Sequence, residues 1–249
     1  MAEDLFAAAA RVLFVHAHPD DETLATGGLI AHLAGQGIEV AVLTATRGER
    51  GEVPPGPLAA LLGTPELAAH REGELARALA ALGATEGAFL GTPPARADGR
   101  TPRRYLDSGM RWLDAGETVA GPGEDAGPDS LSLADPVSIA ADIAAYARHV
   151  RAELIVSYDA HGGYGHPDHV ALHGPSRAAA STLGVPFLEV ASVTDSPGQR
   201  FATPERLDQI KDALASYASQ LTLDGDDVVH VGGQRQPVQV DFTVRTPRA

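Results

Sequence analysis

Two kinds of segment alternate along most of this 249-residue chain, and the alternation restricts it to a small group of folds. Short apolar runs are typical of buried parallel strands, and longer stretches with apolar residues three or four apart are typical of helices. The expected strands are residues 11–15, 38–44, 86–90, 153–158 and 186–193. The expected helices are residues 23–36, 66–82, 135–150, 168–183 and 203–221. This order predicts an α/β fold, a Rossmann-like, mostly parallel sheet with helices on both faces.

Two regions depart from the alternation. Residues 91–134 are rich in glycine and proline, and we expect a segment of this length to be a lid or an irregular insertion. Residues 222–249 are expected to form short terminal strands, two of them between residues 228 and 244. No linker separates two halves, so residues 1–249 are expected to fold as a single domain.

The composition argues against several classes of function. Acidic side chains number 33 and basic ones 19, which gives a net charge of −14. Such a chain is repelled by nucleic acids and anionic membranes, so neither is an expected partner. There is no cysteine, which excludes disulfides and thiolate metal ligands. No apolar run approaches the roughly 20 residues that span a bilayer.

The expected location is cytoplasmic. The first four residues, Met1-Ala2-Glu3-Asp4, are acidic, whereas a signal peptide opens with positive charge followed by an apolar block. The oligomeric state is left open, with a homo-oligomer among the options.

The first chemically informative segment is His-Ala-His-Pro-Asp-Asp-Glu at residues 16–22, directly after the first expected strand. This position would bring His18 to the C-terminal edge of the sheet, where ligand sites of open α/β sheets usually lie. Three consecutive acids alone are typical of a helix start, because its partial positive charge favours them. Capping does not account for His18 at the same turn. His16 follows the strand directly and is expected to pack against its end.

The second segment, Gly-Gly-Tyr-Gly-His-Pro-Asp-His at residues 162–169, follows another expected strand in the same way. His166 and His169 are three residues apart, so both can face one side of a first helical turn. Two such histidines alone are ordinary surface or core residues. Together with the first segment they predict a site with two imidazoles and one carboxylate for Zn²⁺ or a similar ion, with a position left open for water. This combination indicates a metal-dependent hydrolase.

The paired segments resemble those of the PIG-L/LmbE family of zinc-dependent N-deacetylases, above all the members that deacetylate N-acetylglucosaminyl-inositol in the mycothiol pathway. The likeness covers most of residues 11–183. It implies a small N-acetylated amino sugar or glycoconjugate as the substrate, His18, Asp21 and His169 as ligands of Zn²⁺ (or of Fe²⁺ or another divalent ion), and Asp20 as general base. Further matches are Gly48-Glu49, Gly51-Glu52, Arg71-Glu72-Gly73-Glu74-Leu75 and Asp107-Ser108-Gly109-Met110.

The chemistry of amide hydrolysis agrees with these assignments. A metal lowers the pKa of its water and polarises the amide carbonyl, and Asp20 can take the proton and later deliver one to the departing amine. Protonated His166 is expected to stabilise the oxyanion, with Asp168 orienting it or raising its pKa. Tyr164 resembles the family tyrosine that closes over the substrate. The alternative is an ordinary packed turn residue.

The remaining matches concern the substrate. Arg71 and Asp107 resemble residues that grip the sugar and its aglycone. Without the resemblance, Arg71 would be a helix-surface charge and Asp107 an unremarkable loop residue. Ala25 stands where a sibling amidase on mycothiol conjugates typically carries lysine, which favours a deacetylase. The region beyond Pro186 is shorter than in the mycothiol-pathway members of the family and diverges from theirs. The identity of the aglycone is therefore left open.

Other functions compete with this interpretation. They are an amidase on mycothiol-type thiol conjugates, a deacetylase of a glycosylated natural product, and a metal-binding α/β module without turnover. Asp20 beside the ligand set argues against the module, since mere binding needs no spare base. The chain contains neither Gly-x-Gly-x-x-Gly after the first strand nor Gly-x-x-x-x-Gly-Lys, which argues against a nucleotide-binding protein.

Overall fold

A mixed sheet of seven strands forms the centre of the computed structural model, which describes residues 5–116, 118–193 and 196–247. The strand order is β3-β2-β1-β6-β7-β12-β8, and the first five strands are parallel to their neighbours. β12 pairs antiparallel with both β7 and β8. The bounds are Arg11–His16 (β1), Glu39–Thr44 (β2), Glu86–Phe89 (β3), Leu154–Tyr158 (β6), Phe187–Val190 (β7), Gln199–Ala202 (β8) and Asp241–Arg245 (β12). The predicted α/β fold class is confirmed.

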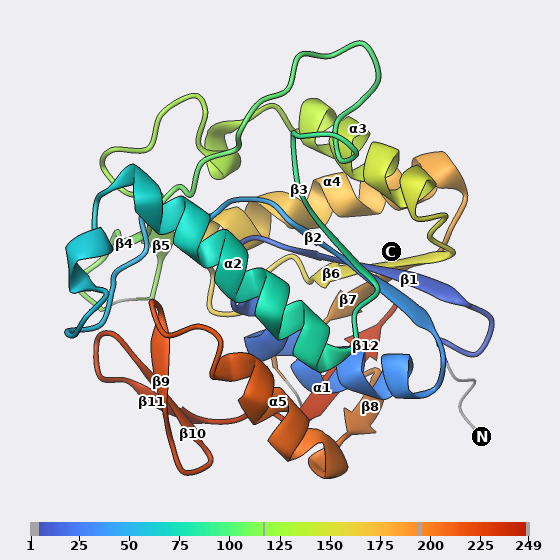
Figure 1. The fold of residues 1–249 in the computed structure, drawn as a ribbon. Coiled ribbons are helices and arrows are strands. Elements are labelled where there is room, and N and C mark those ends of the chain that lie inside the picture. The colour runs from blue at the N-terminus through green and yellow to red at the C-terminus, as the bar shows by residue number, and fades with distance from the viewer. Residues whose placement is uncertain (1–4, 117, 194–195, 248–249) are drawn as a thin grey trace.

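Helices cover both faces of this sheet (Figure 1). One face carries α1 (Asp21–Gly35), α2 (Pro65–Leu82) and α5 (Leu207–Leu214), and the other carries α3 (Pro136–His149) and α4 (Pro167–Leu183). Successive residues of β1 therefore enter different cores. Val12 and Phe14 pack with α1, and Leu13 and Val15 pack on the side of α3. Burial on both faces explains why these strands are continuous apolar runs in the sequence.

The segment 91–134 is irregular apart from two short strands, β4 (Arg111–Trp112) and β5 (Ala120–Gly121), and a 3₁₀ turn at Leu131–Leu133. Another 3₁₀ turn, Ala59–Leu61, precedes α2. The insertion packs on α3, because the buried Tyr105 hydroxyl donates a hydrogen bond to Asp142 at 2.9 Å. An irregular insertion is therefore observed, and its action as a lid stays a prediction.

The prediction for the C-terminal part was wrong in two respects. The expected helix over residues 203–221 is a 3₁₀ turn (Pro204–Arg206) followed by α5, which ends at Leu214. The chain leaves the helix there, and Tyr217 and Ser219 donate hydrogen bonds to the buried carboxylates of Glu22 and Glu74. The two strands expected between residues 228 and 244 are three, β10 (Asp227–His230), β11 (Arg235–Pro237) and β12. β10 and β11 form a separate antiparallel sheet with β9 (Leu221–Asp224).

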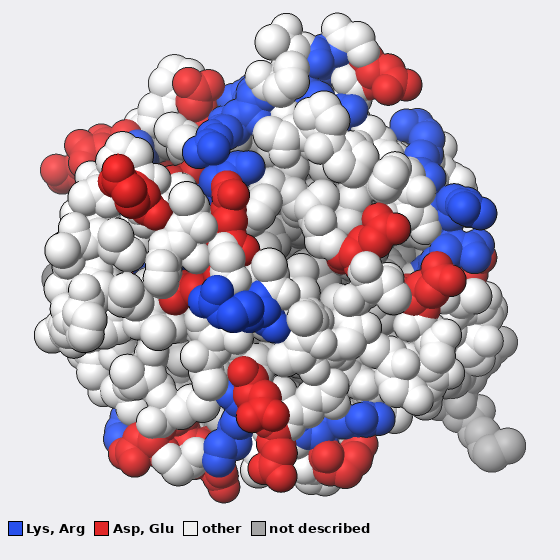
Figure 2. Space-filling model, viewed as in Figure 1, with Lys and Arg blue, Asp and Glu red and all other residues white. Residues whose placement is uncertain are grey.

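Acidic and basic side chains lie intermixed on the face of the molecule seen in Figure 2. None of the helices within the described ranges combines the length and apolarity that crossing a bilayer requires. Residues 1–4, on which the argument against a signal peptide rests, lie outside the described residues, as do residues 248–249 of the terminal segment. Both cores are built on the same sheet, and a single domain stays a prediction.

Candidate active site

The two informative segments meet at the point where the strand order reverses. β1 lies between β2 and β6, and the chain proceeds outward from β1 to β2 and β3 on one side and from β6 to β7 on the other. In open α/β sheets, such a switch point leaves a crevice at the carboxyl ends of the strands. Residues 17–22 follow β1 and residues 159–169 follow β6, so both segments lie at the carboxyl ends of neighbouring strands.

Asp21 lies at the centre of the polar cluster. Its Oδ2 is 3.1 Å from Nδ1 of His18 and 3.1 Å from Nε2 of His169. The same oxygen accepts hydrogen bonds from the His18 backbone N–H and from the Tyr158 hydroxyl, both at 2.8 Å. Burial opposes ionisation of Asp21, but the imidazoles of His169 and His18 outweigh it and hold the pKa of this carboxyl well below its usual range. The cluster therefore contains a carboxylate that is charged at neutral pH.

His169 is oriented with one ring nitrogen free. Its Nδ1 lies 3.2 Å from the carbonyl oxygen of Gly162, which can only accept, so Nδ1 carries the proton. Nε2 then carries a lone pair and lies 3.1 Å from Oδ2 of Asp21, and among the described residues no hydrogen bond is formed to it. Gly162 has φ +69°, and a Cβ there would lie 2.9 Å from Cβ of His169. A backbone carbonyl on one imidazole nitrogen and an open lone pair on the other are typical of a metal-ligating histidine.

The donor atoms around His169 fit a divalent cation. Ligand atoms of His18, His166 and His169 lie within 4.8 Å of one another, and so do those of His18, Asp107 and Asp168. The predicted set of His18, Asp21 and His169 shares both of its histidines with the first group. Imidazole nitrogens combined with carboxylate oxygens suit Zn²⁺ and Fe²⁺. The structure thus brings together residues that could hold such an ion, with His166 as a further donor beside them.

Asp20 has a strained backbone at the N-cap position of α1, and its side chain makes no capping hydrogen bond. Its φ and ψ are 109° and −33°, a region that residues with a Cβ rarely adopt. The backbone N–H donates to Oε2 of Glu22 at 3.1 Å, and the carbonyl accepts from Leu24 at 2.8 Å. Among the described residues, no group donates a hydrogen bond to the Asp20 side chain. Burial, together with the charges of Asp21 and Glu22, raises the pKa of Asp20 well above its usual range. Such a carboxyl is suited to general-base work near neutral pH.

The strain at Asp20 can be measured. We expect Asp20→Gly to raise the free energy of unfolding of the metal-free chain by about 1 kcal/mol, because glycine adopts positive φ without steric cost. Asp20→Ala is the matched control, since it removes the same charge and keeps the strain. Urea unfolding of both variants checks this, and equal stabilities would show that no strain is stored at this position.

His166 differs from its expected protonation state. Its Nδ1 accepts a hydrogen bond from the backbone N–H of Asp168 at 3.2 Å, which leaves any proton of the neutral ring on Nε2. Burial lowers the pKa of His166 to about 3, and the neighbouring imidazoles of His18 and His169 add to the effect. The expected imidazolium is therefore wrong for this environment. A neutral ring with a proton on Nε2 remains a hydrogen-bond donor toward the cluster.

Asp168 also has partners other than the expected ones. Its carboxylate accepts hydrogen bonds from the backbone N–H of Ser108 at 2.9 Å, from the Ser108 hydroxyl, and from the backbone N–H of Ser132 at 3.0 Å. Nε2 of His18 lies 3.2 Å away. The carboxylate does not orient His166 through a hydrogen bond, because Ser108 and Ser132 occupy it, but its charge acts to raise the pKa of His166, which was the alternative expected. Through these hydrogen bonds, Asp168 instead links the irregular insertion to the cluster.

Arg71 has a structural role in this fold. Its side chain is 2% exposed. Nη1 donates to the Gly48 carbonyl, Nη2 to the Glu52 carbonyl at 2.7 Å, and Nε to the Ser219 hydroxyl at 3.2 Å. A Cβ at Gly51 would collide with the guanidinium. The expected contact with a sugar is thus replaced by contacts that join the loop after β2 to the segment after α5.

Asp107 and Tyr164 lie beside the cluster. Asp107 is buried, and its Oδ1 is 3.7 Å from Nε2 of His18. Tyr164 is 60% exposed, and its ring centroid lies 5.5 Å from that of His169 and 5.9 Å from that of His166. It follows Gly163, whose φ is +70°. Both positions suit contact with a bound substrate, the role expected for these residues.

Several side chains of the site escaped the sequence analysis. Tyr158 contacts both informative segments, Ser108 and Ser132 bind Asp168, and the fully buried Glu22 accepts hydrogen bonds from Thr23 and Tyr217. The position of Tyr158 at the carboxyl end of a strand beside β1 was a signal that could have identified it. Ser108 lies in the matched stretch Asp107-Ser108-Gly109-Met110, whereas Ser132 had no comparable local signal.

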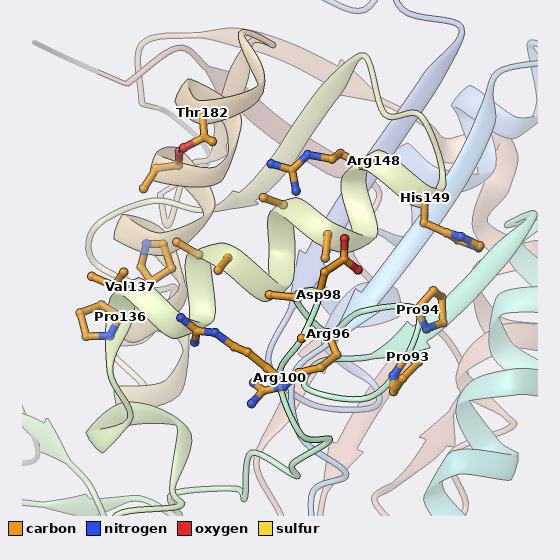
Figure 3. A pocket seen from close by; sticks show the side chains of 18 of the residues that line it. Pro93, Pro94, Arg96, Asp98, Arg100, Pro136, Val137, Arg148, His149 and Thr182 are labelled. Carbon is orange, nitrogen blue, oxygen red and sulfur yellow. The ribbon is translucent and has the colours of Figure 1, made fainter.

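A large pocket of about 1090 Å³ lies elsewhere, between α3, α4 and residues 93–100 (Figure 3). Alanines and prolines line it together with Arg96, Arg100 and Arg148. None of the clustered histidines and carboxylates is among its lining residues, and His149 is its single histidine. Metal-dependent or acid–base chemistry needs convergent titratable groups, so the cluster and not this pocket is the candidate active site.

Comparison with known proteins decides the family. Residues 13–180 match the family described as PIG-L, GlcNAc-PI de-N-acetylase. The chain belongs to the PIG-L family. This match includes both informative segments, and it confirms the resemblance found in the sequence.

Curated PIG-L relatives are named 1D-myo-inositol 2-acetamido-2-deoxy-alpha-D-glucopyranoside deacetylase. The relative from Kineococcus radiotolerans is 52% identical over 163 residues, which are 66% of this chain and 42% of that protein. The relative from Tsukamurella paurometabola is 38% identical over 230 residues, or 87% of this chain and 69% of that protein. The chain spans between 42% and 66% of the length of the first three relatives.

Solved structures share the fold of this PIG-L chain at low identity. A deacetylase–teicoplanin complex superposes with a TM-score of 0.59 at 21% identity, over 96% of this chain and 100% of that one. N,N'-diacetylchitobiose deacetylase from Pyrococcus horikoshii gives 0.56 at 18% identity, over 85% and 72%. A 4-carboxy-2-hydroxymuconate hydratase from Pseudomonas putida gives 0.55 at 17% identity, over 96% and 97%. Because a hydratase shares the fold, function has to be argued from the site.

Proposed function

We propose that this chain is a metal-dependent N-deacetylase, a hydrolase that removes the acetyl group from an N-acetylglucosamine-type substrate. The observation that carries the proposal is the cluster at the switch point of the sheet. There His18 and His169 flank Asp21 at 3.1 Å, and Asp20 next to them keeps a carboxylate without a hydrogen-bond partner among the described residues. Membership of the PIG-L family supports the same reaction.

His18, Asp21 and His169 would hold the ion, and Zn²⁺ is the expected one, with Fe²⁺ as the alternative. The unpaired Nε2 of His169 and the charged Asp21 support this assignment. When bound, a divalent cation lowers the pKa of water and polarises the amide carbonyl.

The residues of the chain supply the proton transfers. Asp20 takes the proton of the attacking water on its carboxylate and delivers a proton to the departing amine nitrogen. Nε2–H of neutral His166 donates a hydrogen bond to the oxygen on which negative charge develops. Asp107 accepts hydrogen bonds from hydroxyl groups of the sugar, and Tyr164 covers the bound substrate.

The substrate class follows from the family and its relatives. The relatives are named for a glucosamine derivative joined to inositol, and we extend this class to the present chain. Ala25, in place of the lysine typical of mycothiol-conjugate amidases, supports deacetylation over amidase activity. A cytoplasmic location stays a prediction, and the oligomeric state stays open.

Removal of the metal tests the proposal. Protein stripped with a chelator is expected to release no amine from N-acetylglucosaminyl-inositol or from N-acetylglucosamine, and added Zn²⁺ is expected to restore release, faster with the inositol conjugate. Anaerobic addition of Fe²⁺ compares the two ions. Turnover that persists without metal would contradict the mechanism, and metal binding without turnover of either sugar would contradict the substrate class.

A further inference from the structure

Tyr158 is the last residue of β6 and lies at the switch point beside β1. Its side chain is buried, and its hydroxyl already has protein partners on both sides, the backbone N–H of Ala17 and the carboxylate of Asp21. It contacts the turn after β1 and the first turn of α4. One side chain thus links the two segments that supply the proposed metal ligands.

The neighbours of the Tyr158 hydroxyl determine which group accepts its proton. Its oxygen accepts a hydrogen bond from the backbone N–H of Ala17 at 2.9 Å, and a backbone N–H can only donate. The hydroxyl proton is therefore left for Oδ2 of Asp21, 2.8 Å away. This bond fixes one oxygen of Asp21 and holds the carboxylate in a single orientation between the two imidazoles.

The ring of Tyr158 also restricts His169. The two rings are stacked, with centroids 4.2 Å apart and planes inclined by 7°. The Gly162 carbonyl fixes Nδ1 of His169 from another side. With its plane set by Tyr158 and one edge set by Gly162, the imidazole has one rotamer that directs Nε2 toward Asp21.

We propose that Tyr158 is a positioning residue that sets the geometry of Asp21 and His169 for metal binding. The inference rests on the proposed function in that it takes these two residues as ligands. A partner that orients a ligating side chain typically contributes about 10–100-fold in metal affinity or activity. Because the Tyr158 hydroxyl already has both of its partners within the protein, its effect should appear in the metal site and in kcat, and not in substrate binding.

The test uses Tyr158→Phe, which keeps the ring and removes the hydroxyl, and Tyr158→Leu, which removes both. Tyr146→Phe is the matched control, because Tyr146 is also buried and its hydroxyl has no hydrogen-bond partner among the described residues. Zn²⁺ affinity of the full chain is measured without substrate, by competition with a chromophoric chelator. We expect Tyr158→Phe to bind Zn²⁺ about 10–100-fold more weakly, Tyr158→Leu more weakly still, and Tyr146→Phe like the parent chain.

Two further measurements distinguish an effect of Tyr158 on ligand geometry from a general loss of stability. The visible absorption spectrum of the Co²⁺-loaded chain reports ligand geometry, and it should change in Tyr158→Phe and not in Tyr146→Phe. With the metal site saturated, Tyr158→Phe should lower kcat and leave KM unchanged. Parent-like Zn²⁺ affinity and Co²⁺ spectrum in both Tyr158 variants would overturn the inference.

The test of Tyr158 can fail or succeed independently of the test of the proposed deacetylation. Metal affinity is read without turnover, so failure to hydrolyse any N-acetyl sugar would overturn the proposed reaction and leave the Tyr158 result intact. Failure of the parent chain to bind any divalent ion would overturn the metal assignment itself.

Discussion

Asp20→Asn is expected to lower kcat by about 10²–10⁴-fold while the metal content stays that of the parent chain. An amide cannot accept the proton of the attacking water, but it has nearly the shape of the carboxylate. Asparagine also tolerates positive φ better than other residues with a Cβ, so the backbone at 109° is retained. Metal analysis and steady-state kinetics on the same preparation check both parts of the prediction.

His169→Ala provides the contrast, since it removes a proposed ligand and should lose both metal and turnover. The pair of variants separates the proton-transfer role from the ligand role. A near-normal kcat for Asp20→Asn would show that another group takes the proton, and loss of metal from this variant would show that Asp20 is itself a ligand.

Arg71→Leu is expected to lower the free energy of unfolding by about 3–5 kcal/mol, because each buried polar group left without its partner costs about 1–3 kcal/mol. The guanidinium satisfies the carbonyls of Gly48 and Glu52 and the hydroxyl of Ser219, and leucine leaves these buried groups unpaired. Chemical denaturation of the metal-free chain measures the loss without any substrate.

Arg77→Leu is the control for this variant, because Arg77 is an exposed arginine on the same helix. We expect it to unfold like the parent chain. If Arg71→Leu kept the stability of the parent and instead raised KM, the direct sugar contact expected from the sequence would be restored.

Much of the fold could be predicted from the sequence as far as residue 183. Burial on both faces of the sheet leaves continuous apolar runs, and the helices between them keep regular apolar spacing. The segment after α5 could not be predicted in this way. Leu214 and Tyr217 continue the helical spacing, but the chain leaves the helix, and the Tyr217 hydroxyl donates to Glu22 nearly 200 positions earlier in the sequence.

The position of the site could also be predicted from the sequence, whereas the contacts of several residues in it could not. His18 and Asp21 lie in the turn after β1 and at the start of α1, and His169 lies in the first turn of α4 after β6. They come together because β1 and β6 are neighbours at the switch point. Asp168 and Arg71 take partners from residues 108 and 132, in the insertion, and from residue 219, after α5. No periodicity relates such segments, so those contacts required the folded chain.

The contacts of Tyr217 and Ser219 have a consequence for fragments and chimaeras of this protein. The stretch that matches the family ends at residue 180, yet Glu22, Arg71 and Glu74 inside it take hydrogen-bond partners from residues 217–219. A fragment cut at the family boundary would strip three buried polar groups of those partners. Any exchange of the C-terminal part with a longer relative should therefore place its junction after Gln220, so that Glu22, Arg71 and Glu74 keep these partners.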